Sequence, residues 1–146
     1  MDIKVINNHF KDYKLNNTKI FELLHSISEN ENKFFSLVNI ILEKDEYLRI
    51  LKKKYFNQDM YTDVISFNLE NPDDPIEGEV YISLPRIIEN AHQYRDSLNN
   101  ELKRIIIHGI LHLIGYNDNT DLDKENMTSL ENKYIKINPG EIIQYS

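Results

Sequence analysis

Two histidines stand four residues apart in an apolar stretch, "IHGILHLIGYND" at 107–118. Residues i and i+4 of an α-helix project from the same face about one turn apart, so the imidazoles of His108 and His112 can reach one metal ion. Gly115 falls on the same face, where a side chain would obstruct the pair and where a glycine can end the helix in a left-handed conformation. The chain can then turn back and bring Asp118 towards the two histidines.

This spacing predicts a metal site with three ligands, His108, His112 and Asp118. The pattern H-x-x-x-H-x-x-G-x-x-D is similar in spacing to the zinc-protease pattern H-E-x-x-H-x-x-G-x-x-H. Two imidazoles and a carboxylate, with a fourth position left open, are typical of a catalytic Zn²⁺, and another divalent transition metal can take the same ligands. The chain contains no cysteine, so thiolate ligands are excluded.

Other interpretations of the same residues stay open. Histidines in a buried helix can donate to carbonyl or carboxylate groups and remain core residues, and Asp118 in "YNDNT" can form an Asx-turn or a cap. A peptidase needs a glutamate directly after the first histidine, where this chain has Gly109, so peptide hydrolysis is disfavoured. His9, His25 and His92 stand alone, and we expect none of them to be a ligand.

The elements that would position these residues follow from the apolar periodicity and from turn and cap residues. We expect strands at 3–6, 34–42, 63–69 and 79–84, the last two forming a β-meander across a loop at 70–78 that contains two prolines and a glycine. We expect helices at 18–29, at 45–56, from a Ser83 cap to about 96, at 100–116, and from a capping box near Thr120 to about 135.

The helix at 100–116 is apolar nearly all round, which predicts a buried central helix carrying the metal ligands. Together the elements indicate an α+β fold, with a mixed four-stranded sheet packed against about five helices and a zincin-like metal helix in the core. A length of 146 residues suits one domain spanning 1–146. No apolar stretch approaches the roughly 20 residues that span a bilayer, and no secretory signal is recognisable, so we expect a cytoplasmic protein without a membrane partner.

The stretch "HGILHLIGYND" resembles the signature H-G-x-L-H-L-x-G-Y-D-H of the YbeY-type endoribonucleases of bacterial rRNA maturation. Three further segments resemble motifs of that family in the same order: "TDVISF" at 62–67, "GEVYIS" at 78–83 and "MTSLE" at 127–131. The resemblance implies a metal-dependent endoribonuclease specific for single strands, acting in 16S rRNA 3′-end maturation and ribosome quality control. The partners that it implies are single-stranded RNA, rRNA and the small ribosomal subunit. It implies no binding to DNA.

Two departures from the family pattern bear on the predicted site. Asp118 replaces the third histidine of the signature, and in "YFNQD" at 55–59 Phe56 replaces an arginine of the family's Y-R-x-x-D segment. Arg86 or Lys54 is a candidate for the cation that would then face the phosphate. The sequence identifies no general base.

The formal net charge of −7 disfavours a nucleic-acid partner, because binding phosphates requires positive surface. One local cluster, Arg49, Lys52, Lys53 and Lys54, provides such surface and is the predicted RNA-binding segment, unless it is an ordinary solvated helix face. The acidic total and Phe56 favour a second hypothesis, a ribosome-assembly or RNA-binding factor with a structural metal and little catalysis. A third hypothesis is another zinc hydrolase, such as a peptidase.

Overall fold

The computed structural model describes residues 1–69 and 75–145. Within these residues the chain forms, in order, β1 (Asp2–Asn7), β2 (Tyr13–Leu15), α1 (Asn17–Glu31), β3 (Phe35–Glu43), α2 (Asp45–Phe56), β4 (Val64–Asn68), β5 (Ile76–Ser83), α3 (Leu84–Tyr94), α4 (Leu98–Ile114), α5 (Asp121–Ile137) and β6 (Ile143–Tyr145). The four longer strands and the five helices agree with the α+β prediction.

The main sheet is mixed, with strand order β1-β3-β5-β4. β3 pairs in parallel with both β1 and β5, and β4 pairs antiparallel with β5. The expected β-meander is therefore reduced to the single β4–β5 hairpin, because β3 lies on the other side of β5 and runs parallel to it. β5 begins at Ile76 rather than 79, since Ile76 to Gly78 already pair with β3, and residues 70–74 of the predicted loop lie outside the described residues.

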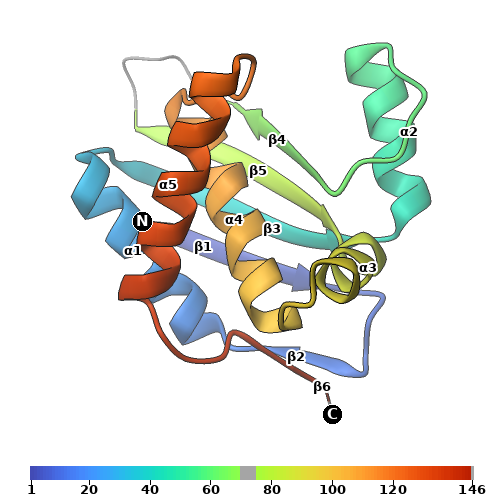
Figure 1. The fold of residues 1–146 in the computed structure, drawn as a ribbon, viewed down its shortest axis with the longest axis horizontal. Coiled ribbons are helices and arrows are strands. Elements are labelled where there is room, and N and C mark those ends of the chain that lie inside the picture. The colour runs from blue at the N-terminus through green and yellow to red at the C-terminus, as the bar shows by residue number, and fades with distance from the viewer. Residues whose placement is uncertain (70–74, 146) are drawn as a thin grey trace.

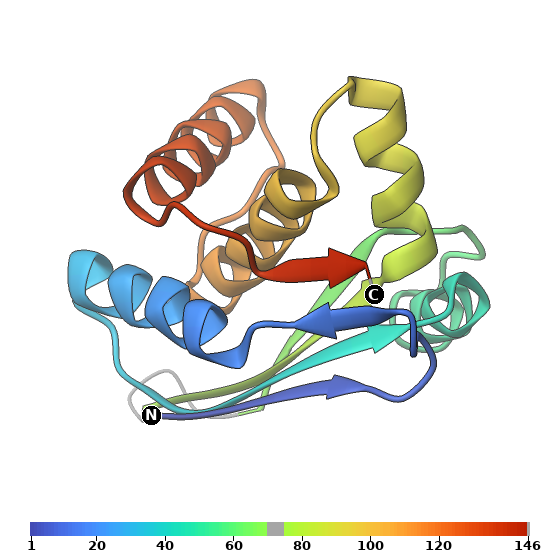
Figure 2. The ribbon, with the colours of Figure 1, turned by 90° about the horizontal axis from the view of Figure 1, so that it is seen from below.

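Four helices, α1, α3, α4 and α5, cover one face of this sheet (Figures 1 and 2). Side chains alternate along β5, so Val80 and Ile82 join the main core beneath these helices. Tyr81 points to the opposite face, where it packs with Leu48 and Leu51 of α2 in a smaller cluster. α2 therefore approaches the sheet from the other side, at the end occupied by β4 and β5 (Figure 1).

Helix α4 is the central helix of the main core, as its apolar residues predict. It begins at a Ser97 cap, three residues before the predicted start, and ends at Gly115, whose φ of 118° is the left-handed conformation expected there. Gly109 brings α4 close to the sheet, because a Cβ at this position would lie 2.6 Å from Cγ1 of Val80. Ser66 of β4 adds a hydrogen bond of 2.9 Å to the Gly109 carbonyl.

Most of the other predicted boundaries hold. α2 spans 45–56 as expected, the Ser83 hydroxyl caps α3, and Thr120 and Asp123 form the capping box of α5. The three-residue strands β2 and β6, which pair antiparallel with each other, were not predicted because each is too short to show a periodicity. Among the described residues no helix is both long and apolar enough to cross a bilayer.

Candidate metal centre

The last two turns of α4 and the loop that follows it bring the three predicted ligands together. Nε2 of His108 and Nε2 of His112 lie 3.0 Å apart. Oδ2 of Asp118 lies 3.5 Å from Nε2 of His108 and 3.9 Å from Nε2 of His112. One ligand atom from each of the three residues lies within 4.8 Å of the others, so the cluster can hold a metal ion.

Hydrogen bonds at the other ring nitrogens show which atoms are available to a metal. Nδ1 of His108 donates to Oε2 of Glu131 at 2.8 Å, and Nδ1 of His112 donates to the carbonyl of Tyr116 at 3.0 Å. In the neutral rings both Nε2 atoms therefore carry lone pairs, and these face each other and the Asp118 carboxylate. Three acceptors converge without a donor between them, an arrangement that fits a divalent cation.

The two histidines differ in the direction of their pKa shifts. Burial alone lowers the pKa of His108, but the hydrogen bond that its ring donates to Glu131 and the negative charges of Glu131 and Asp118 outweigh this effect, and the net pKa is raised. Burial and the neighbouring His108 lower the pKa of His112. The contact with Glu131 is therefore the main difference between the electrostatic surroundings of the two rings.

Glu131 of α5 supports the cluster from behind. Its side chain is only 8% exposed, and Oε1 accepts from Arg104 at 3.2 Å while Oε2 holds His108. A carboxylate that hydrogen-bonds a ligating histidine fixes its ring and increases its basicity. The sequence prediction quoted Glu131 within a motif but gave it no role. The available signal was a glutamate on the buried side of α5, four residues after Met127 and three before Tyr134.

The loop that carries Asp118 is fastened at Tyr116. The phenol of Tyr116 donates to Oε1 of Glu31 at 2.5 Å, and Tyr134 of α5 donates to the other oxygen of the same carboxylate. The hydrogen bond to Glu31 and partial burial raise the pKa of Tyr116. Glu31 at the end of α1 thus joins α1, α5 and the loop. Gly115 is needed for its conformation alone, since a Cβ there would meet nothing within 4 Å and the predicted obstruction does not exist.

The cluster opens onto a cleft of about 550 Å³. The cleft runs between β4, the end of α4 with its following loop, and the C-terminal part of α2. The residues that line it are Lys52, Phe56, Thr62, Asp63, Val64, Ile65, Ser66, His108, His112, Asp118 and Asn119. Phe56, at the position of the family arginine, therefore lies in the wall of the cleft that holds the metal cluster.

Of the four predicted RNA-binding residues, Lys52 alone lines the cleft. Arg49 is engaged by Asp59 at 2.7 Å and by Tyr61, whereas Lys52 lines the cleft. Lys53, four residues after Arg49, lies on the Arg49 side of α2 near Asp59, and Lys54 is exposed about 100° further round the helix. RNA binding by these four residues stays a prediction.

Neither predicted phosphate-side cation lies in the cleft wall. Arg86 is held by Asp45 at 2.7 Å and lines a neighbouring hollow with Tyr61 and Asn90. The ammonium of Lys54 lies 5.2 Å from the ring centre of Tyr55, on an exposed part of α2.

The three remaining histidines lie apart from this cluster, as expected. His9 contacts Glu43 at 3.1 Å, and His25 contacts Glu29 at 3.0 Å on exposed α1. His92 lines a separate hollow beside α3.

Comparisons with known proteins agree over most of the chain. A sequence model of the family described as "Endoribonuclease YbeY" matches residues 4–138. An Endoribonuclease YbeY of Amoebophilus asiaticus is 39% identical over 127 residues, covering 86% of this chain and 86% of the relative. The one of Flavobacterium psychrophilum is 39% identical over 120 residues, covering 82% and 85%. A solution structure of a Thermotoga maritima protein superimposes with a TM-score of 0.60 at 27% identity, covering 92% of this chain and 87% of that one.

Proposed function

The chain belongs to the YbeY endoribonuclease family, a family of hydrolases, and we propose that it is a metal-dependent, single-strand-specific endoribonuclease. We place its action in 16S rRNA 3′-end maturation and ribosome quality control. The observation that carries the proposal is the cluster of His108, His112 and Asp118, whose ligand atoms converge at the wall of an open cleft. We further propose that 1–146 acts as one domain.

A bound divalent ion, Zn²⁺ in our proposal, would supply a Lewis acid and a water of lowered pKa next to a phosphodiester. The protein's part is to hold this ion and to orient the substrate. His108 and His112 are held by Glu131 and by the Tyr116 carbonyl, so both Nε2 atoms are already turned towards a shared ion. The carboxylate of Asp118 is 41% exposed, so the cleft side of the cluster is open to a ligand.

This openness supports a catalytic rather than a structural ion. Structural zinc sites are closed by four protein ligands, whereas catalytic sites keep one position for water or substrate. Within the described part of the chain, the cluster offers three possible protein ligands, His108, His112 and Asp118. These residues line a cleft and are not enclosed in the core.

The packing of Gly109 argues against peptide hydrolysis by the zinc-protease route. That route places a glutamate directly after the first histidine. A Cβ at 109 would lie 2.6 Å from Cγ1 of Val80 and 3.1 Å from Oγ of Ser66, so the close packing of α4 on the sheet leaves no room for a glutamate at this position.

The test is cleavage of matched single-stranded and double-stranded RNA by protein loaded with Zn²⁺. We expect cleavage of the single strand, and of a precursor 16S rRNA 3′ end in small-subunit particles. His108→Ala should lose both bound metal and cleavage. His25→Ala is the matched control, because His25 is an exposed helical histidine outside the cluster, and it should retain both. A metal-loaded wild type that leaves RNA intact, or a fully active His108→Ala protein, would contradict the proposal.

A further inference from the structure

The metal cleft has an unusual charge distribution for a site that receives a phosphodiester. Two carboxylates line it, Asp63 and Asp118. Of the described residues in its wall, Lys52 alone carries a permanent positive charge. Behind the wall, Arg104 offsets Glu131 at 3.2 Å, so this pair adds little net charge to the cleft.

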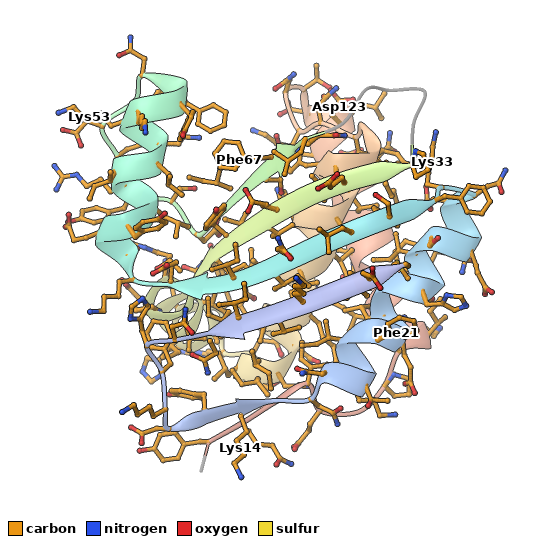
Figure 3. All side chains as sticks on the ribbon, turned by 180° about the vertical axis from the view of Figure 1, so that it is seen from behind. Lys14, Phe21, Lys33, Lys53, Phe67 and Asp123 are labelled. Atoms are coloured by element: carbon orange, nitrogen blue, oxygen red, sulfur yellow. The ribbon has the colours of Figure 1, made fainter. Side chains whose placement is uncertain are left out.

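Lys52 is held in place by the residue one turn further along α2. Its ammonium lies 4.9 Å from the ring centre of Phe56, a cation–π contact between positions i and i+4 of the helix. The Phe56 ring is in turn stacked on Phe67 of β4, at a centroid distance of 6.1 Å. Lys52 is half-buried, while Lys53 is exposed, and in Figure 3 Lys53 projects from the side of α2 turned away from the sheet.

The charges of the cleft explain why one lysine matters. A divalent ion would be balanced by Asp118 and Asp63, which leaves the site close to neutral towards an incoming phosphate. With a histidine in place of Asp118, the same ion would keep one more positive charge. Lys52 restores a net positive charge, and inside a cleft that low-dielectric walls partly enclose such a charge is screened less than on an open surface.

We propose that Lys52 binds the phosphate backbone of the RNA inside the metal cleft, with Phe56 as the residue that positions it. The inference rests on the proposed function and adds to it the cation that replaces the missing family arginine. Lys52 thus differs from Lys53 and Lys54, which have no place in the cleft wall.

Lys52→Gln and Lys53→Gln are a matched pair, with the same charge change on adjacent residues of α2. The probes are a cleavable single-stranded RNA and its uncleavable 2′-O-methyl analogue, with metal content measured in each protein. For Lys52→Gln we expect kcat/KM and affinity for the analogue to fall about 10- to 100-fold at unchanged metal content, the range for a hydrogen bond to a charged group. The slope of log affinity against log salt should fall by about 0.7, the value for one phosphate contact on a single strand. Lys53→Gln should stay within about twofold.

A rescue variant separates a local charge from a general loss of stability. Lys52→Gln/Phe56→Arg returns a positive charge to the same cleft from the same face of α2, and it should recover most of the lost affinity. Equal effects of Lys52→Gln and Lys53→Gln on binding, or an unchanged salt slope in Lys52→Gln, would overturn the inference. If the wild type cleaves no RNA, the proposed function fails at its own test, while binding of the analogue still decides the role of Lys52.

Discussion

Asp118 stands where the motif resemblance implies a third histidine, and its carboxylate completes the cluster at 3.5 Å and 3.9 Å from the two Nε2 atoms. A carboxylate brings a negative charge that an imidazole does not. The water on a bound ion should therefore have a higher pKa here than on three neutral histidines.

We expect Asp118→Ala to weaken metal affinity more than tenfold, because loss of even a supporting partner of a ligand commonly costs about 10- to 100-fold. Asp118→His should keep the metal and move any pH–rate profile towards acid. Titration with Zn²⁺ against a competing chelator measures the metal affinity of both variants. RNA cleavage at a series of pH values measures the shift of the pH–rate profile. If Asp118→Ala keeps full affinity and only lowers the melting temperature, Asp118 is a turn residue and not a ligand.

Glu131 provides a second test at the scale of one residue. In Glu131→Gln the amide oxygen can still accept from His108, but the negative charge that raises the basicity of the ring is lost. We expect metal affinity to fall about tenfold or more. Glu125→Gln, an exposed change on the same helix, should leave it unchanged. Equal affinities in the two variants would show that Glu131 serves only to pair Arg104.

The clustering of His108, His112 and Asp118 was predictable from sequence, because these residues and Gly115 fall within eleven residues of one helix and its cap. Glu131 has no role in the sequence prediction, and Lys52 is predicted only as one of four RNA-binding residues, because their places beside the cluster depend on how α5 and α2 pack against α4 and β4. The linear cluster of Arg49 with the lysines does not reveal that Lys52 alone of the four lines the cleft, because that depends on how α2 packs beside β4.

At the scale of elements, α4 depends on the close approach that its glycine allows. Gly109→Ala should destabilise the fold by about 1–3 kcal/mol, because the added methyl group overpacks against Val80. The higher helix propensity of alanine should offset up to about 1 kcal/mol of this loss. Urea unfolding of Gly109→Ala, Val80→Ala and the double variant measures this. We expect the double variant to lose less than the sum of the single losses, because the second change opens space for the first. If the losses of stability in the two single variants are strictly additive in the double variant, α4 accommodates the alanine by shifting and the contact with Val80 is not the cause of the loss.

The elements themselves were largely predictable where apolar periodicity or capping residues mark them, as for α2 and α5. Strand order was not, because parallel pairing of β1, β3 and β5 is a matter of long-range contacts rather than local pattern. The predicted start of β5 is too late in the sequence because Pro75 and Gly78 both favour a loop, although Gly78 is a strand residue that faces Leu113 of α4.

At the scale of the whole molecule, the excess of acidic over basic residues bears on the stability of the fold as well as on RNA binding. Glu101, buried in the first turns of α4, has its pKa raised, first by burial and then by surrounding carboxylates, against the opposing effect of Arg104. A carboxyl whose pKa is higher in the folded state contributes stability below its unfolded pKa of about 4.3 and loses it as the pH rises through the folded pKa.

Glu101→Gln should therefore be more stable than the wild type at pH 7, with the difference disappearing below about pH 4. Thermal unfolding between pH 4 and pH 8 measures it, with exposed Glu125→Gln as the control. If the wild type is more stable than Glu101→Gln at pH 7, attraction of the Glu101 carboxylate to Arg104 or to the helix N-terminus outweighs the cost of burying its charge.

The pairing of β2 with β6 has a consequence for the order in which the molecule folds. It joins Tyr13 to Tyr145, and the amide of Asn16 donates to the carbonyl of Ile142 at 2.8 Å, so the chain must close a loop of nearly its full length. Such closure is entropically costly and is compensated only once the intervening segments are compact. The metal ligands and Glu131, by contrast, all lie within residues 108–131. We therefore expect the metal cluster to assemble before these two strands pair, and amide hydrogens of β2 and β6 to exchange faster than those of α4.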